Sequence, residues 1–274
     1  MTDEKIVLLD YDGFVVKSYY ASKSKDNITG DEPLDILLSL EEGAVERAKE
    51  YYDTDNIKIL RVMSGHTFKK DIFPGYKGQR KKDEELGEYR DWVKNNCDIV
   101  MAHNLEADDY ITLVNYNQDM LVFSDDKDLR KYNRLCARIN PTEEIIETPP
   151  VIMQEEQLIQ MITGDSIDNI KGIKGRGEVY ARKLMDKNGY TFDTVVRAYK
   201  DNNVDVDECF KNLCEVIPIS LDWIDEDYLA AAKMLRRQIL ANRFDYKITM
   251  STIEGFCRYI NKKVKEVYYN GSKS

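Results

Sequence analysis

The stretch KIVLLDYDGFVVKS, residues 5–18, combines an apolar run with two carboxylates, Asp10 and Asp12, at the point where that run ends. A short continuous apolar run is typical of a strand buried on both faces of a parallel sheet. Two phosphate chemistries use an acid in this place. In one, Asp10 attacks phosphorus directly; in the other, it binds a metal ion. The rest of the sequence has to distinguish them.

Short apolar runs alternate with helix-like segments over the first part of the chain. Strand-like runs occupy residues 5–9, 57–63, 98–102, 120–124 and 134–140, and helical spacing occupies residues 33–52 and 106–117. This order predicts an α/β fold with a mainly parallel sheet flanked by helices. From about residue 151 the spacing is helical, at residues 151–162, 177–185, 191–200 and 221–240. We therefore expect an α/β domain over residues 1–160, a helical region over residues 161–274, and a frayed tail at residues 268–274.

The composition indicates a globular protein without a membrane span. The 274 residues are 42% hydrophobic and 33% charged, and no stretch approaches the roughly 20 apolar residues that a membrane helix needs. The N-terminus is acidic, unlike a signal peptide, so we expect a cytoplasmic protein. Five cysteines without close pairs, beside two histidines, argue against a disulfide framework or a zinc site.

The net charge of −10 at first argues against a nucleic-acid partner. This total is misleading if acids are concentrated at one site. Three groups of acids follow predicted strands, and the carboxyl ends of parallel strands meet at one rim of a sheet. Like charges at one rim repel unless cations neutralise them, so the groups predict hard cations such as Mg²⁺. The groups are Asp10 with Asp12, Glu106 with Asp108 and Asp109, and Asp125 with Asp126 and Asp128.

Each acidic group by itself has a simpler explanation, as a solvated helix start or an Asp-rich turn. Asn104 is a candidate N-cap that would place the acids at 106–109 in a first helical turn, where the helix dipole favours negative charge. A fourth pair, Asp165 and Asp168, is spaced to lie on one face of a helix or turn. This pair could point back at the same rim.

Three segments resemble phosphatases of the haloacid dehalogenase type, whose first Asp is a nucleophile. They are LLDYDGFV (8–15), VFS (122–124) and GDSIDN (164–169). In that family the late acid pair should follow a buried strand, whereas EEQLIQMIT (155–163) has helical spacing. In addition, EADD (106–109) and YKGQRKK (76–82) correspond to no motif of that family. This resemblance explains the sequence poorly.

The full set of motifs resembles the 5′ nuclease family of flap endonucleases and 5′→3′ exonucleases, particularly small bacterial and bacteriophage members without a polymerase domain. Asp10, YKGQR (76–80), EADD (106–109), SDDKD (124–128) and TGDSIDNIKGIKGRGEVYARKL (163–184) occur in the family's order, and the resemblance covers roughly residues 4–190. It implies a monomeric, divalent-metal-dependent nuclease of DNA replication or repair. The substrate would be DNA with a 5′ flap, nick or free 5′ end, or an RNA:DNA hybrid. The resemblance implies replication proteins as partners. If a phage encodes the chain, the protein would act in the cytoplasm of the host cell.

The resemblance also implies two Mg²⁺ ions, for which Mn²⁺ could substitute. Such ions can activate water and stabilise the leaving oxygen without a nucleophilic side chain. The implied ligands of the first ion are Asp10, Glu106, Asp108 and Asp109, and those of the second are Asp126, Asp128, Asp165 and Asp168. Without these eight carboxylates the net charge of the chain would be −2, so its basic segments gain importance.

A basic segment at residues 69–82 holds six basic residues and the single acid Asp71. By itself this composition is typical of a solvated, charged loop. The family resemblance instead implies an arch, at about residues 66–95, for a single-stranded 5′ end, in which cations bind phosphates and aromatic rings stack on bases. We expect Lys77 and Arg80 to act in catalysis, and Lys17, Tyr76 and Lys81 to bind DNA with them.

A glycine-rich turn before a helix is ordinarily only a turn. Here GIKGRGEVYARKL (172–184) follows the Asp165/Asp168 pair directly, which matches a helix-hairpin-helix-type motif at about residues 164–190. In such a motif glycines let the backbone approach a duplex phosphate, which the next helix favours through its N–H groups. The implied contacts are Gly172, Lys174, Gly175, Arg176 and Gly177, with a K⁺ ion bridging hairpin and phosphate in relatives.

One position departs from the family pattern: Ser64 stands in RVMSGH (61–66) where the family usually has an Asp. Weaker metal binding would follow, unless Asp71 or another acid fills the role. The departure leaves open a flap or junction DNA-binding protein with little catalysis. A PIN-type ribonuclease would share the acidic rim without needing the glycine-rich hairpin.

Overall fold

The computed structural model describes residues 4–27, 29–72, 74–115, 119–140, 142, 144–209 and 250–270. Its contacts divide the chain into two units. The sheet unit contains the described residues up to His66 and Lys81–Pro149, and the helical unit contains Thr67–Arg80 and the described residues from Pro150 onward. The division near Pro150 differs from the expected boundary at residue 160, because a whole helix begins there. The expected arch at 66–95 is likewise shared between the two units.

The sheet unit is built on six strands in the order β3-β2-β1-β4-β5-β6. β1 pairs in parallel with β2 and β4, β4 pairs in parallel with β5, and only β6, among the pairs described, is antiparallel. The predicted mainly parallel α/β fold is thus confirmed. The strands are β1 (Lys5–Asp10), β2 (Ile57–Thr67), β3 (Val100–Asn104), β4 (Leu121–Phe123), β5 (Leu135–Ala137) and β6 (Ile146–Glu147).

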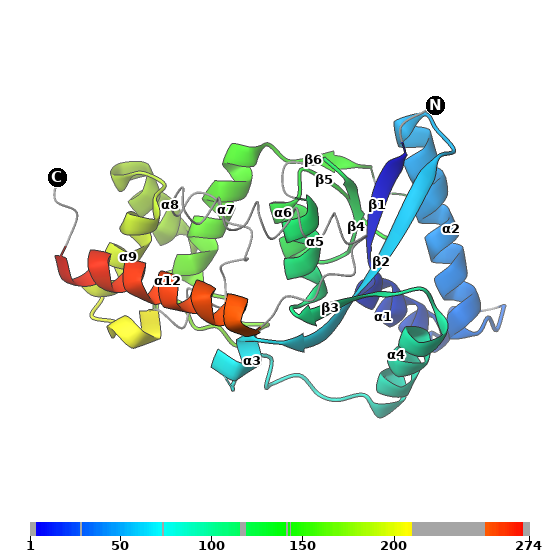
Figure 1. The fold of residues 1–274 in the computed structure, drawn as a ribbon, viewed down its shortest axis with the longest axis horizontal. Helices are drawn as coiled ribbons and strands as arrows, with labels where there is room; N and C mark the ends of the chain where they lie inside the picture. The colour runs from blue at the N-terminus through cyan, green and yellow to red at the C-terminus, as the bar shows by residue number, and fades with distance from the viewer. Residues whose placement is uncertain are drawn as a thin grey trace. The chain divides into compact units, whose positions relative to one another are not determined.

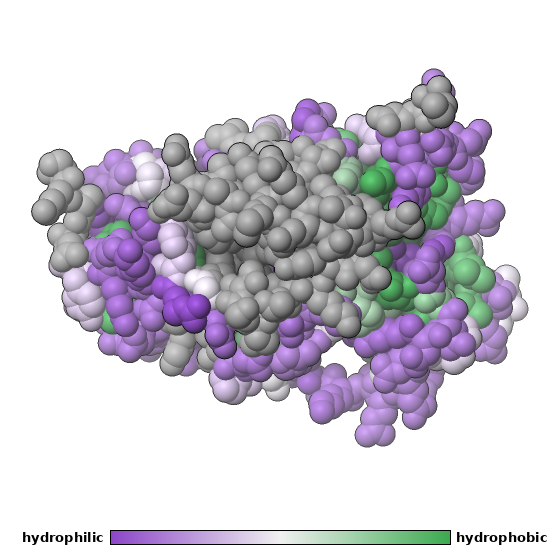
Figure 2. All heavy atoms as spheres, viewed as in Figure 1, coloured by the Kyte–Doolittle hydropathy of each residue, from purple (hydrophilic) through white to green (hydrophobic). Residues whose placement is uncertain are grey.

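Helices cover both faces of this sheet, which explains why β1 is apolar at successive positions. Val7 and Leu9 join a core cluster with α1, α2 and α4, whereas Leu8 points to the opposite face. Figure 1 shows α2 on one side of β1 and α5 on the other. Hydrophobic spheres appear in Figure 2 where α2 lies against the strands. The helices are α1 (Tyr11–Ser22), α2 (Pro33–Tyr52), α4 (Glu84–Asn96), α5 (Ala107–Asn115) and α6 (Lys127–Tyr132).

The helical unit packs α7 against α8 and α9, and α9 against α12. The helical spacing at 151–162, 177–185 and 191–200 predicted α7, α8 and α9 correctly. The frayed tail expected from residue 268 is wrong for residues 268–270, which belong to α12, while its remaining residues and the expected helix at 221–240 lie outside the described residues. No helix among the residues the structure describes is long and apolar enough to span a membrane. The helices are α3 (Lys69–Ile72), α7 (Pro150–Thr163), α8 (Glu178–Asn188), α9 (Phe192–Asp201) and α12 (Met250–Asn270).

The described cysteines form no disulfide. Cys97, Cys136, Cys209 and Cys257 all lie outside any disulfide. Cys136 and Cys209 are buried, and burial raises the pKa of each thiol above its ordinary value. Cys97 and Cys257 are only half-buried.

Candidate active site

Asp10 ends β1 with its carboxylate buried, at 8% exposure. Ser124, directly after β4, donates a hydrogen bond of 2.6 Å from Oγ to Asp10 Oδ2. Burial raises the pKa of Asp10 to about 7, the Ser124 hydrogen bond opposes this rise, and the charges of Asp12 and Asp126 add to it. A buried carboxylate among other carboxylates is stabilised by a cation. Asp10 therefore suits a metal ligand.

A second group of acids lies at the start of α5. One carboxylate oxygen from each of Glu106, Asp108 and Asp109 lies within 4.8 Å of the others, and Glu106 and Asp109 are buried. The sequence pattern placed these three residues together, and the structure does so. Buried carboxylates this close repel each other in their charged forms, so the donor set fits a divalent cation with oxygen ligands.

The predicted N-cap of α5 is wrong. The helix begins at Ala107, and Asn104 belongs to β3 with a left-handed φ of 61°. The Ala107 N–H donates instead to Ser64 Oγ, 2.9 Å away. A residue 43 positions earlier therefore caps this helix, and Ser64 lies directly beside the acidic group of α5. Only Asp108 and Asp109, of the three acids, fall within the first turn.

Ser124 connects Asp10 to the third group of acids. Its Oγ accepts a hydrogen bond of 2.9 Å from the Asp126 N–H while donating to Asp10. Asp126 caps α6, and its Oδ1 accepts from the Asp128 N–H at 2.7 Å. The ends of β1 and β4 thus bring Asp10 and Asp126 together as predicted. Lys17, expected to bind DNA, forms an ion pair of 2.9 Å with Asp125.

Asp12, whose role the sequence left uncertain, links the neighbouring strand β2 to α4. Its Oδ2 accepts from the Ser64 N–H at 2.8 Å, and its Oδ1 is paired with the Arg90 guanidinium of α4. Arg90 and Ser124 are thus site residues that the sequence analysis missed. For Ser124 the signal was its place two residues before Asp126, where a hydroxyl caps a turn. The sequence held no signal for Arg90, because its partner Asp12 lies 78 residues away.

The remaining predicted ligands, Asp165 and Asp168, belong to the helical unit. Asp165 Oδ1 accepts from the Ile167 N–H at 2.8 Å, and its Oδ2 accepts from Gln160 Nε2 at 3.3 Å. Asp168 is contacted by Tyr76 and Arg80. The proposed second ligand set therefore combines two acids from each unit, and its convergence on one ion stays a prediction.

The basic segment does not present Tyr76 as expected. This side chain is buried, at 2% exposure, and its hydroxyl donates to Asp168 Oδ2 at 3.0 Å. The expectation that its ring stacks on a base is corrected, because neither face of a buried ring is open to one. Lys77 is largely buried beside it, whereas Arg80 and Lys81 are exposed.

The glycine-rich turn has two kinds of glycine. A Cβ on Gly172 would lie 2.4 Å from the Thr163 carbonyl carbon, and φ is +58°, so Gly172 is needed for packing against α7. This packing explains the glycine without a ligand, and its assignment as a phosphate contact stays a prediction. Gly175 and Gly177 have no atom within 4 Å of an added Cβ, so both remain open to a ligand. Exposed Lys174 and Arg176 lie between the glycines, and Arg176 is held 4.6 Å from the Tyr180 ring and by Asn202.

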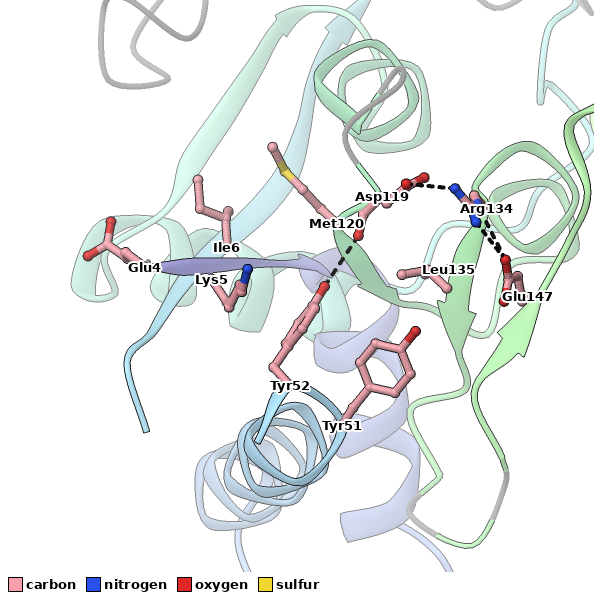
Figure 3. Close-up of a pocket in the computed structure, with 10 residues that line it drawn as sticks. All are labelled: Glu4, Lys5, Ile6, Tyr51, Tyr52, Asp119, Met120, Arg134, Leu135 and Glu147. Carbon is pink, nitrogen blue, oxygen red and sulfur yellow. Dashed lines mark hydrogen bonds and ion pairs between the residues drawn. The ribbon is translucent and has the colours of Figure 1, made fainter. Parts of the chain in front are cut away.

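A pocket of about 640 Å³ lies elsewhere in the sheet unit, at the amino ends of β1, β4 and β5. Figure 3 shows that three of its charged groups face one another: Arg134 is paired with Asp119 at 2.7 Å and with Glu147 at 2.8 Å. None of the predicted site residues lines it. Two of its acids are paired with Arg134, whereas Asp10 is buried near the like charges of Asp12 and Asp126, so the acidic rim is the better candidate site.

Comparison with known proteins places the chain in a family. Residues 5–160 match the family described as 5′-3′ exonuclease, N-terminal resolvase-like domain. The chain belongs to this family, as the motifs predicted, and the match argues against the haloacid dehalogenase-type alternative.

Individual relatives are more distant. A 5′-3′ exonuclease of Mycoplasmopsis pulmonis is 29% identical over 205 residues, which are 67% of this chain and 66% of that protein. DNA polymerase I of Rhizobium leguminosarum is 24% identical over 211 residues, 68% of this chain and 21% of that protein. The chain thus spans just under two thirds of the exonuclease and about a fifth of the polymerase.

Solved structures show the same fold. A bacteriophage T5 protein co-crystallised with metal ions aligns with a TM-score of 0.58 and 14% identity, covering 97% of this chain and 100% of that one. The bacteriophage T5 flap endonuclease in a pseudo-enzyme-product complex with DNA and metal ions aligns with a TM-score of 0.56 and 14% identity, covering 97% and 99%. At this identity the likeness concerns the fold.

Proposed function

We propose that this protein is a divalent-metal-dependent 5′ nuclease, a flap endonuclease and 5′→3′ exonuclease that hydrolyses phosphodiesters in flapped or nicked DNA. The observation that carries the proposal is the acidic rim, where buried Asp10 has a raised pKa near other carboxylates and three more acids gather at the start of α5. The names of the relatives support the same activity, since one is a 5′-3′ exonuclease and another a flap endonuclease bound to DNA and metal ions.

The proposed cofactor is a pair of Mg²⁺ ions, which Mn²⁺ could replace. When bound, such ions supply an activated water and stabilise charge at the scissile phosphate. Ser124 orients Asp10, and the cap that Asp126 forms on α6 fixes Asp126 and Asp128 relative to each other. The first ion is assigned to Asp10, Glu106, Asp108 and Asp109, and the second to Asp126, Asp128, Asp165 and Asp168. A K⁺ ion at the hairpin belongs to the same proposal.

Substrate binding is assigned to two basic regions. Lys77, Arg80 and Lys81 would contact phosphates of the single-stranded 5′ end, with Lys17 in support. Lys174, Gly175, Arg176 and Gly177 would contact the duplex backbone without reading its sequence. A cytoplasmic monomer working beside replication proteins agrees with these assignments.

The deciding experiment compares a labelled 5′-flapped DNA with a single-stranded RNA, each incubated with Mg²⁺ and with EDTA. We expect cleavage near the flap junction that requires Mg²⁺, and little cleavage of the RNA. Tight flap binding without cleavage in either metal would favour the junction-binding alternative. Cleavage of the RNA alone would favour a PIN-type ribonuclease.

Gly177→Ala and Gly172→Ala should separate DNA binding from folding. Gly177 has a φ of −83° and open space around it, so we expect a folded protein whose duplex binding is weakened about threefold to tenfold by the added methyl group. Gly172→Ala should instead unfold the protein at a lower temperature, because its Cβ would meet backbone atoms. Fluorescence anisotropy with duplex DNA and thermal melting measure the two effects.

Gly43→Ala in α2 is the matched control, since nothing lies within 4 Å of its added Cβ and it is outside both basic regions and the expected arch. It should leave duplex binding unchanged and stabilise its helix by about 0.5–1 kcal/mol. Normal duplex binding by Gly177→Ala would contradict the assignment of the hairpin.

Ser64→Asp tests the departure from the family pattern. Its carboxylate could still accept from Ala107 N–H, and it would add negative charge beside the acidic group of α5. We expect the Mg²⁺ concentration for half-maximal cleavage to fall about threefold or more, with the cutting position unchanged. Ser64→Asn, which adds similar bulk without charge, should not lower it. A Mg²⁺ titration that shows an unchanged or raised requirement in Ser64→Asp would mean that position 64 is not the substituted ligand position.

A further inference from the structure

Part of the basic segment, residues 75–80, is docked on the turn at residues 165–170 within the helical unit. Backbone and amide groups make three of the contacts. Lys77 N–H donates to the Asp168 carbonyl at 3.1 Å, Asn169 Nδ2 donates to the Gly75 carbonyl at 2.9 Å, and Gln79 Nε2 donates to Asn169 Oδ1 at 3.0 Å. The docking is therefore a specific set of hydrogen bonds.

The centre of this contact is the carboxylate of Asp168. Its Oδ1 is 2.7 Å from Arg80 Nη2, and its Oδ2 is 3.0 Å from the Tyr76 hydroxyl and 3.7 Å from Lys77 Nζ. Only 17% of the Asp168 side chain is exposed. A guanidinium, an ammonium and a hydroxyl around one anion are the groups that proteins also use to bind phosphate. The carboxylate thus fills an anion site inside the protein.

Backbone conformation shows that the docking holds the segment in an unusual state. Lys77 has a φ of +53°, in the left-handed region that a lysine rarely adopts. The hydrogen bond from its N–H to Asp168 and the turn bond from Gly78 N–H to the Gly75 carbonyl, at 3.0 Å, maintain that conformation. Strain of this kind persists where surrounding contacts determine the geometry, and it is concentrated at functional sites.

We propose that Asp168 is the positioning residue for Lys77 and Arg80, and that its carboxylate occupies their anion site until a phosphate of the DNA strand displaces it. The inference rests on the proposed function, which assigns both cations to phosphate. It adds that DNA binding must break an internal ion pair, so Asp168 lowers the affinity for single strands while it keeps the cations in place. Tyr76 would contribute its hydroxyl to the phosphate.

The first test measures binding of a 5′-phosphorylated single-stranded oligonucleotide in EDTA, where no metal ligand is needed. Asp168→Asn should bind it about threefold to tenfold more tightly than the wild type, because the competing charge is gone. Asp165→Asn is the matched control. It removes another acid of the same turn whose carboxylate accepts from Ile167 and Gln160, and it should bring no comparable gain. Equal gains in both variants, or none in Asp168→Asn, would overturn the proposal.

The second test measures, in the absence of DNA, how firmly Asp168 holds residues 75–80 in place. Trypsin cleavage after Lys77 and Arg80, followed by mass spectrometry, should be several-fold faster in Asp168→Asn than in the wild type or Asp165→Asn. If Asp168→Asn melts too early to compare, Asp168→Glu and Asp168→Gln form a pair of equal size, of which only the glutamine should tighten binding and speed cleavage. Similar behaviour of that pair would contradict the role of the charge.

The two proposals fail differently. A wild-type protein that neither binds nor cleaves any DNA would overturn the proposed nuclease function. A wild-type protein that cleaves flapped DNA with Mg²⁺, together with an Asp168→Asn variant that gains no affinity for single strands, would overturn the role of Asp168 alone.

Discussion

Replacing Asp10 by asparagine is expected to abolish metal-dependent cleavage and, at pH 8 in EDTA, to raise the melting temperature of the protein. The loss of cleavage should be about 10³-fold or more, because a ligand of the first proposed ion is removed. The gain in stability follows from the environment of Asp10. Its carboxylate is buried near Asp12 and Asp126, so charging it in the folded protein without metal is unfavourable.

The pH dependence has a definite sign. Burial raises the pKa of Asp10 from 3.8 in the unfolded chain to about 7, so the folded state holds its proton more tightly. Stability from this group is fully present below pH 3.8 and is lost as the pH rises toward and through 7. The advantage of Asp10→Asn should therefore be small near pH 4, grow up to about pH 7, and then level off at on the order of a few kcal/mol.

Thermal melts in EDTA at several pH values, compared with cleavage assays in Mg²⁺, measure both effects. Asp125→Asn is the control, because Asp125 follows the same strand β4 but is exposed and paired with Lys17. It should retain cleavage and show no gain in melting temperature that grows with pH. Wild-type cleavage by Asp10→Asn would remove Asp10 from the proposed ligands.

Asp126→Asn should also abolish cleavage while leaving flap binding in EDTA intact or slightly tighter. Asparagine caps helices about as well as aspartate, so the hydrogen bond to Asp128 N–H at the start of α6 can be kept. Only the negative charge is lost, and with it both a proposed metal ligand and a group that repels phosphate. We expect a decrease in cleavage of about 10³-fold or more with little change in melting temperature.

Asp119→Asn provides the comparison for Asp126→Asn. Asp119 pairs with Arg134 in the pocket at the amino ends of the strands (Figure 3), away from the acidic rim. It should change cleavage by less than about twofold. A similar loss of cleavage in both variants would point to a general effect of charge, and near-normal cleavage by Asp126→Asn would refute the proposed second metal site.

Local patterns in the sequence determined the class of fold and much of the site. The apolar run at 5–9 and the helical spacing at 33–52 identified β1 and α2 closely, because burial on both faces of a strand or on one face of a helix imposes a period. Acids at the ends of such runs could then be assigned to one rim. The antiparallel strand β6 was missed, since its two residues are exposed and carry no pattern.

Tertiary structure alone decided how the site residues are held. Ser64 caps α5 from 43 residues away, Arg90 reaches Asp12 across 78 residues, and Arg80 reaches Asp168 across 88. These pairings made Asp12 a link between β2 and α4, took Tyr76 out of reach of DNA bases and gave Asp168 a basic partner. A periodic pattern reports which face of an element is buried. Such a pattern does not predict which distant polar group will bond to a given side chain, because that pairing depends on how separate elements pack.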